Sequence, residues 1–217
     1  TILILSGCPQ GGVLSPFLWN LVLDSLLRSF HSWPKSIQAF ADDLALLILG
    51  IDVSTIMSIA QEHINSCSNW CASKGLKISH IKTQVVMFTR RTKWKITRPL
   101  FINNSPVTLS KTATYLGVTL DSRLTWTPHI SNKADAAFGA LFACRVAVGQ
   151  DWGLSPHIAR FIFTAVVSPS LTYACVAWSR SLSKKCNLSR LSRVQRIACL
   201  MITRGFPSSA SGALTII

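Results

Sequence analysis

The hydrophobic and polar positions change their spacing about halfway along the chain. Up to about residue 122, short apolar runs alternate with turn residues, whereas helical periodicity dominates from about Pro128. The first part predicts helices over 16–30 and 54–74, hairpins over 36–49 and 101–109, and strands over 83–89 and 115–120. The second part predicts helices over 130–148, 156–167 and 185–203, with breaks at Gly153, Pro156, Pro169 and residues 205–207. This order of elements predicts an α+β fold.

The ends of the first two helices carry specific residue signals. Ser15 is expected to cap the first helix, with Pro16 in the first turn, where its missing N–H costs nothing. Ser54 is expected to cap the second helix and Gly75 to end it. These signals place one helix on each side of the hairpin predicted over 36–49.

That hairpin contains two adjacent carboxylates, Asp42 and Asp43, between apolar arms. Two carboxylates about 4 Å apart repel by roughly 4 kcal/mol at an effective dielectric of 20, so a fold that keeps them together usually supplies a cation. Divalent magnesium is the natural candidate. The alternative is that Asp42 only makes the hairpin polar.

A glycine-rich segment, GCPQGGVLSP over 7–16, precedes the first helix. Its glycines allow a close backbone approach to a ligand, and Gln10 offers that ligand both a donor and an acceptor. The alternative is that these glycines only make a tight turn.

Four motifs follow one another along the chain: GCPQGGVLSP over 7–16, FADD over 40–43, GLKISHIKT over 75–83 and YLGV over 115–118. In this order they resemble reverse transcriptases of non-LTR retrotransposons, especially the Jockey-like group. The resemblance continues at lower specificity through LTYACVAW over 171–178 and RVQR over 193–196. It therefore covers nearly the whole chain.

The resemblance implies DNA synthesis in which a DNA primer hydroxyl attacks a deoxynucleoside triphosphate on an RNA template. It implies Asp42 as a direct ligand of the two magnesium ions of a complete active site, with Asp43 as a supporting or variable ligand. Gln10 and Gly11 would line the nucleotide and template pocket, and Lys82 would lie near the triphosphate. The primer grip would be formed by Tyr115, Leu116 and Gly117. For Lys82 the alternative is a surface lysine at a strand start.

The resemblance also implies domain boundaries. Residues 1–122 would form part of a palm, an antiparallel sheet with helices, followed by a helical thumb over 123–205 and the start of a downstream linker over 206–217. The family's fingers and its first palm motif, which carries another catalytic aspartate, are expected to be missing, because the chain opens in mid-strand without an initiating Met. We therefore expect the isolated 217 residues not to polymerise DNA; primer extension above an Asp42→Ala background would contradict this.

Charge is distributed unevenly along the chain. There are 22 Lys and Arg against 8 Asp and Glu, a net charge of +14. Residues 1–73 hold 2 basic and 5 acidic groups, residues 74–133 hold 11 and 1, and residues 134–217 hold 9 and 2. An acidic, metal-seeking segment is thus followed by a basic surface able to neutralise phosphates. The alternative is that the basic charge serves only solubility or membrane contact.

The helix predicted over 185–203 has an apolar face and a cationic flank that includes Arg190, Arg193 and Arg196, with Arg204 just beyond it. Periodicity alone indicates an amphipathic helix. The family resemblance assigns the cationic flank to the backbone of a nucleic-acid duplex. The alternative is a plain solvated face.

Seven cysteines without framework spacing indicate reduced thiols inside a cell. His63, Cys67 and Cys71, spaced by four on one helix, invite a zinc hypothesis. Ligands at this spacing climb a helix by roughly 12 Å, too far for one tetrahedral ion, so buried thiols in an apolar stripe are favoured.

Three function classes follow from these residues. The first is a fragment of an RNA-directed DNA polymerase, acting on RNA template, DNA primer and deoxynucleoside triphosphates in a ribonucleoprotein of nucleus and cytoplasm. The second is a decayed or domesticated remnant that binds nucleic acid without catalysis. The third, a hydrolase that uses the acidic pair, lacks a positioned base or nucleophile. No apolar run reaches the roughly 20 residues of a bilayer span, so no membrane partner is expected.

Overall fold

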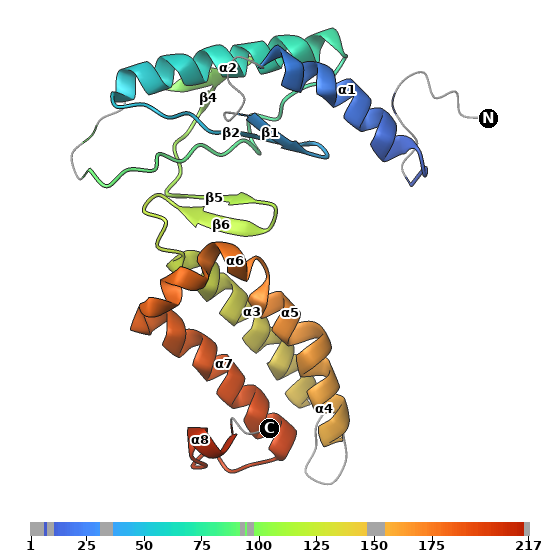
Figure 1. Ribbon diagram of the computed structural model, residues 1–217, viewed down its shortest axis with the longest axis vertical. Coiled ribbons are helices and arrows are strands. Elements are labelled where there is room, and N and C mark those ends of the chain that lie inside the picture. The colour runs from blue at the N-terminus through green and yellow to red at the C-terminus, as the bar shows by residue number, and fades with distance from the viewer. Residues whose placement is uncertain are drawn as a thin grey trace. The chain divides into compact units, whose positions relative to one another are not determined.

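The computed structural model describes residue 7 and residues 11–30, 37–91, 94, 98–146 and 155–214. The chain divides into two compact units: Thr1–Val85 with Arg90–Ser110, and Val86–Thr89 with Lys111–Ile217. Both contain helices and two-stranded antiparallel hairpins (Figure 1), so the fold is α+β. The boundary expected at residue 122 lies inside the second unit, and the division into palm and thumb stays a prediction.

The described residues of the first unit form two helices and two hairpins, as the spacing of apolar residues predicts. In chain order they are α1 (Ser15–Ser29), β1 (Ile37–Phe40), β2 (Asp43–Leu46), α2 (Val53–Ser73), β3 (Leu100–Ile102) and β4 (Ser105–Val107). β1 pairs only with β2, and β3 only with β4, so the described strands form separate hairpins rather than one continuous sheet.

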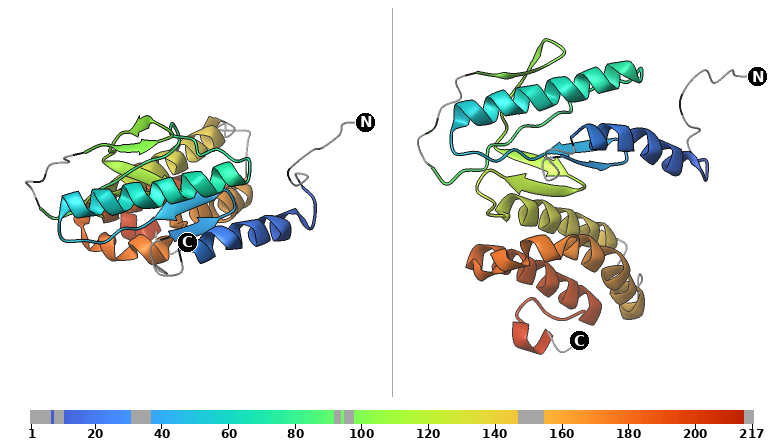
Figure 2. Two further views of the ribbon diagram at one scale, coloured as in Figure 1. Left: turned by 90° about the horizontal axis from the view of Figure 1, so that it is seen from above. Right: turned by 45° about the horizontal axis from the view of Figure 1, so that its top comes forward.

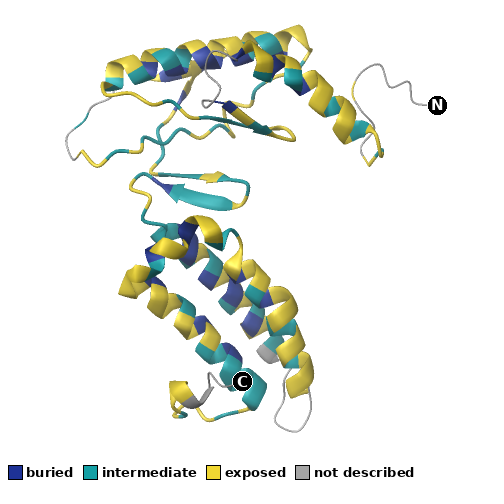
Figure 3. Ribbon diagram, viewed as in Figure 1, coloured by how far each residue is buried: buried dark blue, intermediate teal, exposed yellow. Residues whose placement is uncertain are grey.

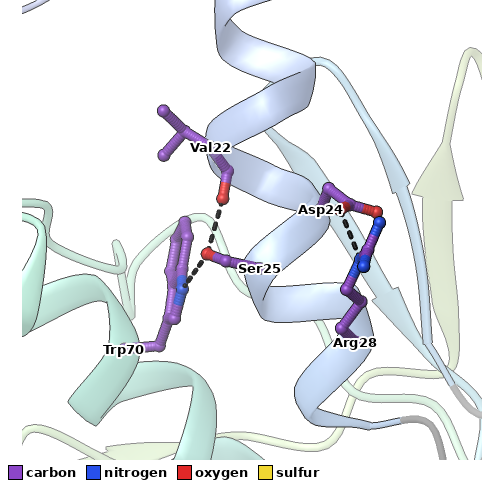
Figure 4. Close-up of polar contacts among 5 residues, drawn as sticks. All are labelled: Val22, Asp24, Ser25, Arg28 and Trp70. Atoms are coloured by element: carbon purple, nitrogen blue, oxygen red, sulfur yellow. Dashed lines mark hydrogen bonds and ion pairs between the residues drawn. The ribbon is translucent and has the colours of Figure 1, made fainter.

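Helices α1 and α2 share a hydrophobic core with strand β1. Its buried side chains are Leu23, Leu26, Phe30, Ile37 and Cys67, which lie within the dark segments of Figure 3. A polar contact joins the two helices as well: the indole N–H of Trp70 donates to Ser25 Oγ at 3.0 Å, and Ser25 Oγ donates to the Val22 carbonyl at 2.7 Å (Figure 4). Together these contacts fix α1 against α2.

Both helices begin one residue earlier than the sequence predicts, because other residues take the N-cap positions expected for the two serines. Leu14 is the N-cap of α1, and Ser15 is its first residue, with its N–H donating to the Gly12 carbonyl at 3.2 Å. Asp52 caps α2, where its carboxylate accepts from the Thr55 N–H at 3.0 Å and from Ser54 Oγ. A carboxylate is a stronger acceptor than a hydroxyl, so Asp52 takes the position predicted for Ser54. Gly75, at a φ of +70°, follows the end of α2 as expected.

The hairpin β3–β4 is attached to α2 through one side chain. Gln61 Nε2 donates to the Phe101 carbonyl at 2.9 Å, and Gln61 Oε1 accepts from the Phe101 N–H at 2.8 Å. The amide thus bonds the edge of β3 as a neighbouring strand would. Asn103 and Asn104, at φ values of +48° and +65°, make the two-residue turn, as expected for an Asn pair in a hairpin.

The strand expected over 83–89 is wrong. Within the described residues, this segment makes a single parallel bridge, between Val85 and Leu109, and the Ser110 N–H donates to the Val85 carbonyl at 2.9 Å. An alternating apolar pattern becomes a strand only where a partner edge runs beside it, and here the pairing stops after one bridge.

The second unit joins one hairpin to a set of helices. In chain order its elements are β5 (Thr112–Tyr115), β6 (Val118–Asp121), α3 (Thr127–Val146), α4 (Pro156–Ile162), the π-helical turn η1 (Phe163–Val167), α5 (Ser168–Thr172), α6 (Cys175–Trp178), the 3₁₀ turn η2 (Ser179–Ser183), α7 (Lys185–Thr203) and α8 (Ser211–Leu214). The helices expected over 130–148 and 185–203 are confirmed as α3 and α7.

Helices α3, α5 and α7 lie side by side (Figures 1 and 2) around a core of small and branched residues. Its buried members are Ala134, Ala137, Leu141, Val167, Leu171, Val194 and Ala198. The alanines of α3 and α7 have short side chains, which lets the two helix axes approach closely. Val194, at 0% exposure, is enclosed completely.

The break expected at Pro169 is wrong, because the helical path runs from Pro156 through Thr172. Proline lacks an N–H and its ring collides with the carbonyl four residues earlier in a regular α-helix. The wider π-helical turn η1 directly precedes α5 and places Pro169 in the first turn of that helix, where no N–H is needed.

Among the described residues, no single helix is long and apolar enough to cross a membrane. Two successive helical segments, Pro156–Thr172 and Cys175–Ser183, are long and apolar enough only when taken together, and a 50° bend separates them.

Asp121 organises the connection from β6 to α3. One of its carboxylate oxygens accepts from the N–H and the hydroxyl of Thr125, both at 3.0 Å, and the other accepts from the Trp126 N–H at 2.8 Å. These contacts hold Leu124 and Trp126 at positive φ values of +50° and +63°. Burial raises the pKa of Asp121, but the hydrogen bonds outweigh it and the pKa is lowered.

We expect Asp121→Asn to lower the free energy of unfolding of the second unit by about 1 to 3 kcal/mol at neutral pH. The lowered pKa of Asp121 means that its stabilisation is present above the unfolded-state value of about 3.9 and is lost as pH falls through the folded-state value. Urea unfolding measures the free energy of unfolding of the unaltered protein and of Asp121→Asn. The difference between the two values should become smaller below about pH 4. Asp135→Asn, which changes an exposed carboxylate on α3, is the control. A difference in free energy of unfolding between the unaltered protein and Asp121→Asn that does not depend on pH would contradict the expectation.

Candidate functional site

The acidic turn is the connection between β1 and β2. Phe40 pairs with Asp43, so Ala41 and Asp42 form a two-residue turn, with Ala41 at a φ of +51°. Asp42 and Asp43 are both exposed. Within the described residues neither carboxylate accepts a hydrogen bond or forms an ion pair, so their oxygens face solvent.

A side chain of α1 reaches this turn. The indole N–H of Trp19 donates to the Ala41 carbonyl at 2.7 Å. The sequence motifs gave no role to Trp19; its only signal was its place on the helix that follows the glycine-rich segment.

Gly11 precedes α1 with a φ of +82°, and a Cβ built on it would meet no atom within 4 Å. The positive φ therefore favours glycine at position 11, and the space beside this residue is open. Both hypotheses for this segment, a ligand cradle and a tight turn, fit these two observations. Gln10 lies outside the described residues.

Lys82 is exposed and lies in the turn that follows α2. Its backbone N–H donates to Ser79 Oγ at 3.4 Å, and the Thr83 hydroxyl donates to the Ser79 carbonyl at 2.8 Å. In the described part of the chain no hydrogen bond or ion pair joins Lys82 to the acidic turn, and its role near a triphosphate stays a prediction.

Tyr115, Leu116 and Gly117 belong to the second unit. The single strand expected over 115–120 is wrong: Leu116 and Gly117, at φ values of +47° and +72°, form the turn between β5 and β6. Leucine rarely adopts a positive φ, so the pattern of apolar residues hid this turn. Asp42 and Asp43 belong to the first unit, and the position of this turn relative to them stays a prediction.

The turn at Leu116 is held by a tyrosine from the helical part of its own unit. The Tyr173 hydroxyl donates to the Leu116 carbonyl at 2.8 Å, and a Cβ on Gly117 would lie 3.5 Å from the Tyr173 ring. The Lys133 ammonium lies 4.8 Å from the centre of the same ring. The motifs YLGV and LTYACVAW are thereby joined in space, which neither motif alone predicted.

His129 is a second link between the hairpin β5–β6 and the helices. It is 1% exposed, and its Nδ1 accepts from the Thr119 N–H at 3.1 Å. Burial, and then the charge of Lys133, lower the pKa of His129. The neutral ring that results is the form in which Nδ1 can accept a hydrogen bond.

The arginines of α7 divide into two kinds. The Arg196 guanidinium donates to Ser211 Oγ at 2.6 Å and to the carbonyls of Pro207 and Ser209 at 2.7 and 2.8 Å. Arg193 lies over the Phe138 ring, 5.7 Å from its centre. Arg190 on α7 and Arg204, the C-cap residue that follows it, are exposed and make no hydrogen bond or ion pair within the described residues, so both are available to an external anion.

The zinc hypothesis finds no support among the described residues, where no group of three metal-binding side chains gathers. Cys67 is 3% exposed in the core of the first unit. Burial, helped by the neighbouring Cys71, raises the pKa of Cys67 to about 11. Buried thiols in an apolar stripe are confirmed.

Comparison with protein families identifies the family of the chain. The family model for reverse transcriptase (RNA-dependent DNA polymerase) matches residues 2–120, more than half of the chain. The chain belongs to the reverse transcriptase family. The match includes the acidic turn of the first unit and most of the hairpin β5–β6 of the second.

Relatives of this reverse transcriptase chain come from insect non-LTR retrotransposons. A putative 115 kDa protein of the R1 element of Drosophila melanogaster is 26% identical over 91% of this chain and 19% of its own length. A Pol polyprotein of an R1 element of Nasonia vitripennis is 25% identical over 96% of the chain and 64% of its own length. An RNA-directed DNA polymerase from the mobile element jockey of Drosophila melanogaster is 25% identical over 88% and 21%.

The predicted resemblance to Jockey-like reverse transcriptases is thus confirmed, and the chain spans less than two thirds of the length of each of these relatives. No solved structure matches the chain.

We expect Arg196→Ala to loosen the segment 205–212, because the segment loses three hydrogen bonds to one charged group, each of which is typically worth about 1.5 to 3 kcal/mol. Arg196→Lys should loosen it as well, since an ammonium lacks the planar fork that reaches separate acceptors. Hydrogen exchange of the peptides that cover this segment measures the effect. Arg190→Ala is the matched control on the same helix, and equal exchange in all three variants would contradict the role of Arg196.

Proposed function

We propose that this chain is the catalytic part of an RNA-directed DNA polymerase of a non-LTR retrotransposon. One observation carries the proposal: in a chain of the reverse transcriptase family, adjacent carboxylates lie exposed on a hairpin turn. An exposed acidic pair on a short hairpin adds nothing to a hydrophobic core. Its position is explained by binding of a cation and a phosphate.

The donor set of the turn fits magnesium. Mg²⁺ prefers hard oxygen ligands and is usually held by one or two carboxylates together with substrate phosphates and water. Asp42 and Asp43 supply such carboxylates, and both are open to solvent. Asp42 and Asp43 would hold magnesium ions, whose positive charge would favour ionisation of the primer hydroxyl and offset the charge of the leaving pyrophosphate. By family resemblance, a further aspartate from the first palm motif completes that site.

The remaining residues bind and orient the substrates. Gly11, with open space beside its backbone, would line the nucleotide and template pocket together with Gln10. Lys82 would contribute positive charge near the triphosphate. The turn at Leu116 and Gly117 would contact the primer strand, because Gly117 is exposed at the tip of a hairpin that Tyr173 holds in place.

The domain assignment follows from the same proposal. Residues 1–122 form part of the palm, 123–205 the thumb and 206–217 the start of a downstream linker. The exposed Arg190 and Arg204 would face the backbone of an RNA and DNA duplex. The protein would act in a retroelement ribonucleoprotein of nucleus and cytoplasm. The comparisons do not favour a non-catalytic remnant.

The decisive test uses the longest reading frame that contains these 217 residues, expressed as one protein. Asp42→Asn should abolish primer extension on an RNA template, with a loss of at least about 10³-fold in kcat, since electrostatic stabilisation by the ions is lost. Filter binding of the template and primer should stay within about twofold, because the basic groups that neutralise phosphates are unchanged.

Asp24→Asn is the control for loss of a carboxylate. Asp24 lies on α1 of the same unit and forms an exposed ion pair with Arg28 at 2.6 Å, so its removal should leave extension unchanged (Figure 4). Extension that survives in Asp42→Asn would contradict the proposal. Nucleic-acid binding without any extension by the unaltered protein would favour the remnant instead.

A further inference from the structure

The acidic turn has an unfavourable backbone conformation. Ala41 has a φ of +51°, in the left-handed region, where its Cβ comes too close to the following carbonyl oxygen. A non-glycine residue held there costs on the order of 1 kcal/mol or more, and it persists only when its surroundings impose it. Asp42 follows Ala41 directly, so the direction of its side chain depends on this conformation.

Trp19 supplies the contact that can impose it. Its indole N–H, the one polar group of that side chain, donates to the Ala41 carbonyl at 2.7 Å. This hydrogen bond joins residues 22 positions apart and links α1 to the turn itself. A phenylalanine or leucine at position 19 would also provide an apolar side chain, but neither could donate a hydrogen bond to the Ala41 carbonyl.

Helix α1 is a fixed platform for this contact. Leu23 and Leu26, four and seven residues after Trp19, are 5% and 0% exposed in the core that α1 shares with β1 and α2. The hydrogen bond from Trp70 to Ser25 ties the same stretch of α1 to α2 (Figure 4). Because α1 is held on two sides, the position of the Trp19 indole constrains the turn rather than following it.

We propose that Trp19 is a positioning residue for the acidic turn. Its indole N–H holds the Ala41 carbonyl and thereby fixes the backbone from which Asp42 and Asp43 project. Trp19 acts through Ala41 and touches no reacting atom. This role rests on the proposed function, in which the two carboxylates bind the catalytic cations.

The test is a double-mutant cycle between Trp19 and Ala41 in the full polymerase reading frame. Trp19→Phe removes the donor and keeps an aromatic ring, and it should lower kcat about tenfold, the equivalent of 1.4 kcal/mol, with the KM values for primer and nucleotide within twofold. Glycine adopts positive φ about as readily as negative φ, so Ala41→Gly should restore part of the kcat lost in Trp19→Phe. Ala41→Gly alone should stay within about twofold, because the indole still holds the turn.

Gln61→Leu is the matched control. It removes another side chain of the same unit that bonds the backbone of a hairpin, in this case Phe101 of β3, without touching the acidic turn or α1. Its kcat should equal that of the unaltered protein even if its melting temperature falls. All variants are assayed below the melting temperature of the least stable one, so that unfolding does not enter the comparison.

Two results would overturn the positioning role. One is a kcat of Trp19→Phe that equals that of Gln61→Leu; the other is a pair of effects of Trp19→Phe and Ala41→Gly on the free energy of activation that simply add. Asp42→Asn is measured beside them. If it is active, the proposed function fails; if it is inactive while Trp19→Phe is fully active, only the role of Trp19 fails.

Discussion

A two-stranded hairpin is at best marginally stable in water by itself, and each described hairpin of this chain is short. Each one is therefore attached to a helix through hydrogen bonds from a side chain to its backbone. Trp19 of α1 bonds the turn of β1–β2, and Gln61 of α2 bonds β3. Tyr173 and His129 bond the hairpin β5–β6. These few side chains thus add rigidity to the candidate functional turns.

Local pattern was sufficient for elements whose stability is local. The helix over 185–203, the acidic hairpin and the turn at Asn103 and Asn104 follow from periodicity and turn chemistry within a few residues. Elements that depend on remote partners were mispredicted. The segment 83–89 lacked a partner strand beyond one bridge, and Leu116 adopts a turn conformation that its own side chain disfavours. Pro169 continues a helix because a π-helical turn precedes it.

The candidate site shows the same division. The acidic pair was visible in the sequence because carboxylates inside an apolar run need a chemical reason. Trp19 and Tyr173 were not, because their contacts join residues 22 and 57 positions apart and one sequence gives no sign of such pairs. Arg196 looked like its neighbours on α7, yet it bonds the chain's own carbonyls. Charge in a sequence does not distinguish an arginine that binds a ligand from one that binds the fold.

The π-helical turn η1 also limits how the length of the chain can change. A π-helical turn holds one residue more than the α-helical turn it replaces. Deletion of one residue between Phe163 and Val167 would restore α-helical spacing and leave the faces of α4 and α5 in register, because one full turn replaces another. The ring of Pro169 would then collide with the carbonyl four residues earlier, because the wider turn that precedes it is lost. This stretch can accept substitutions during evolution far more readily than the loss of a single codon.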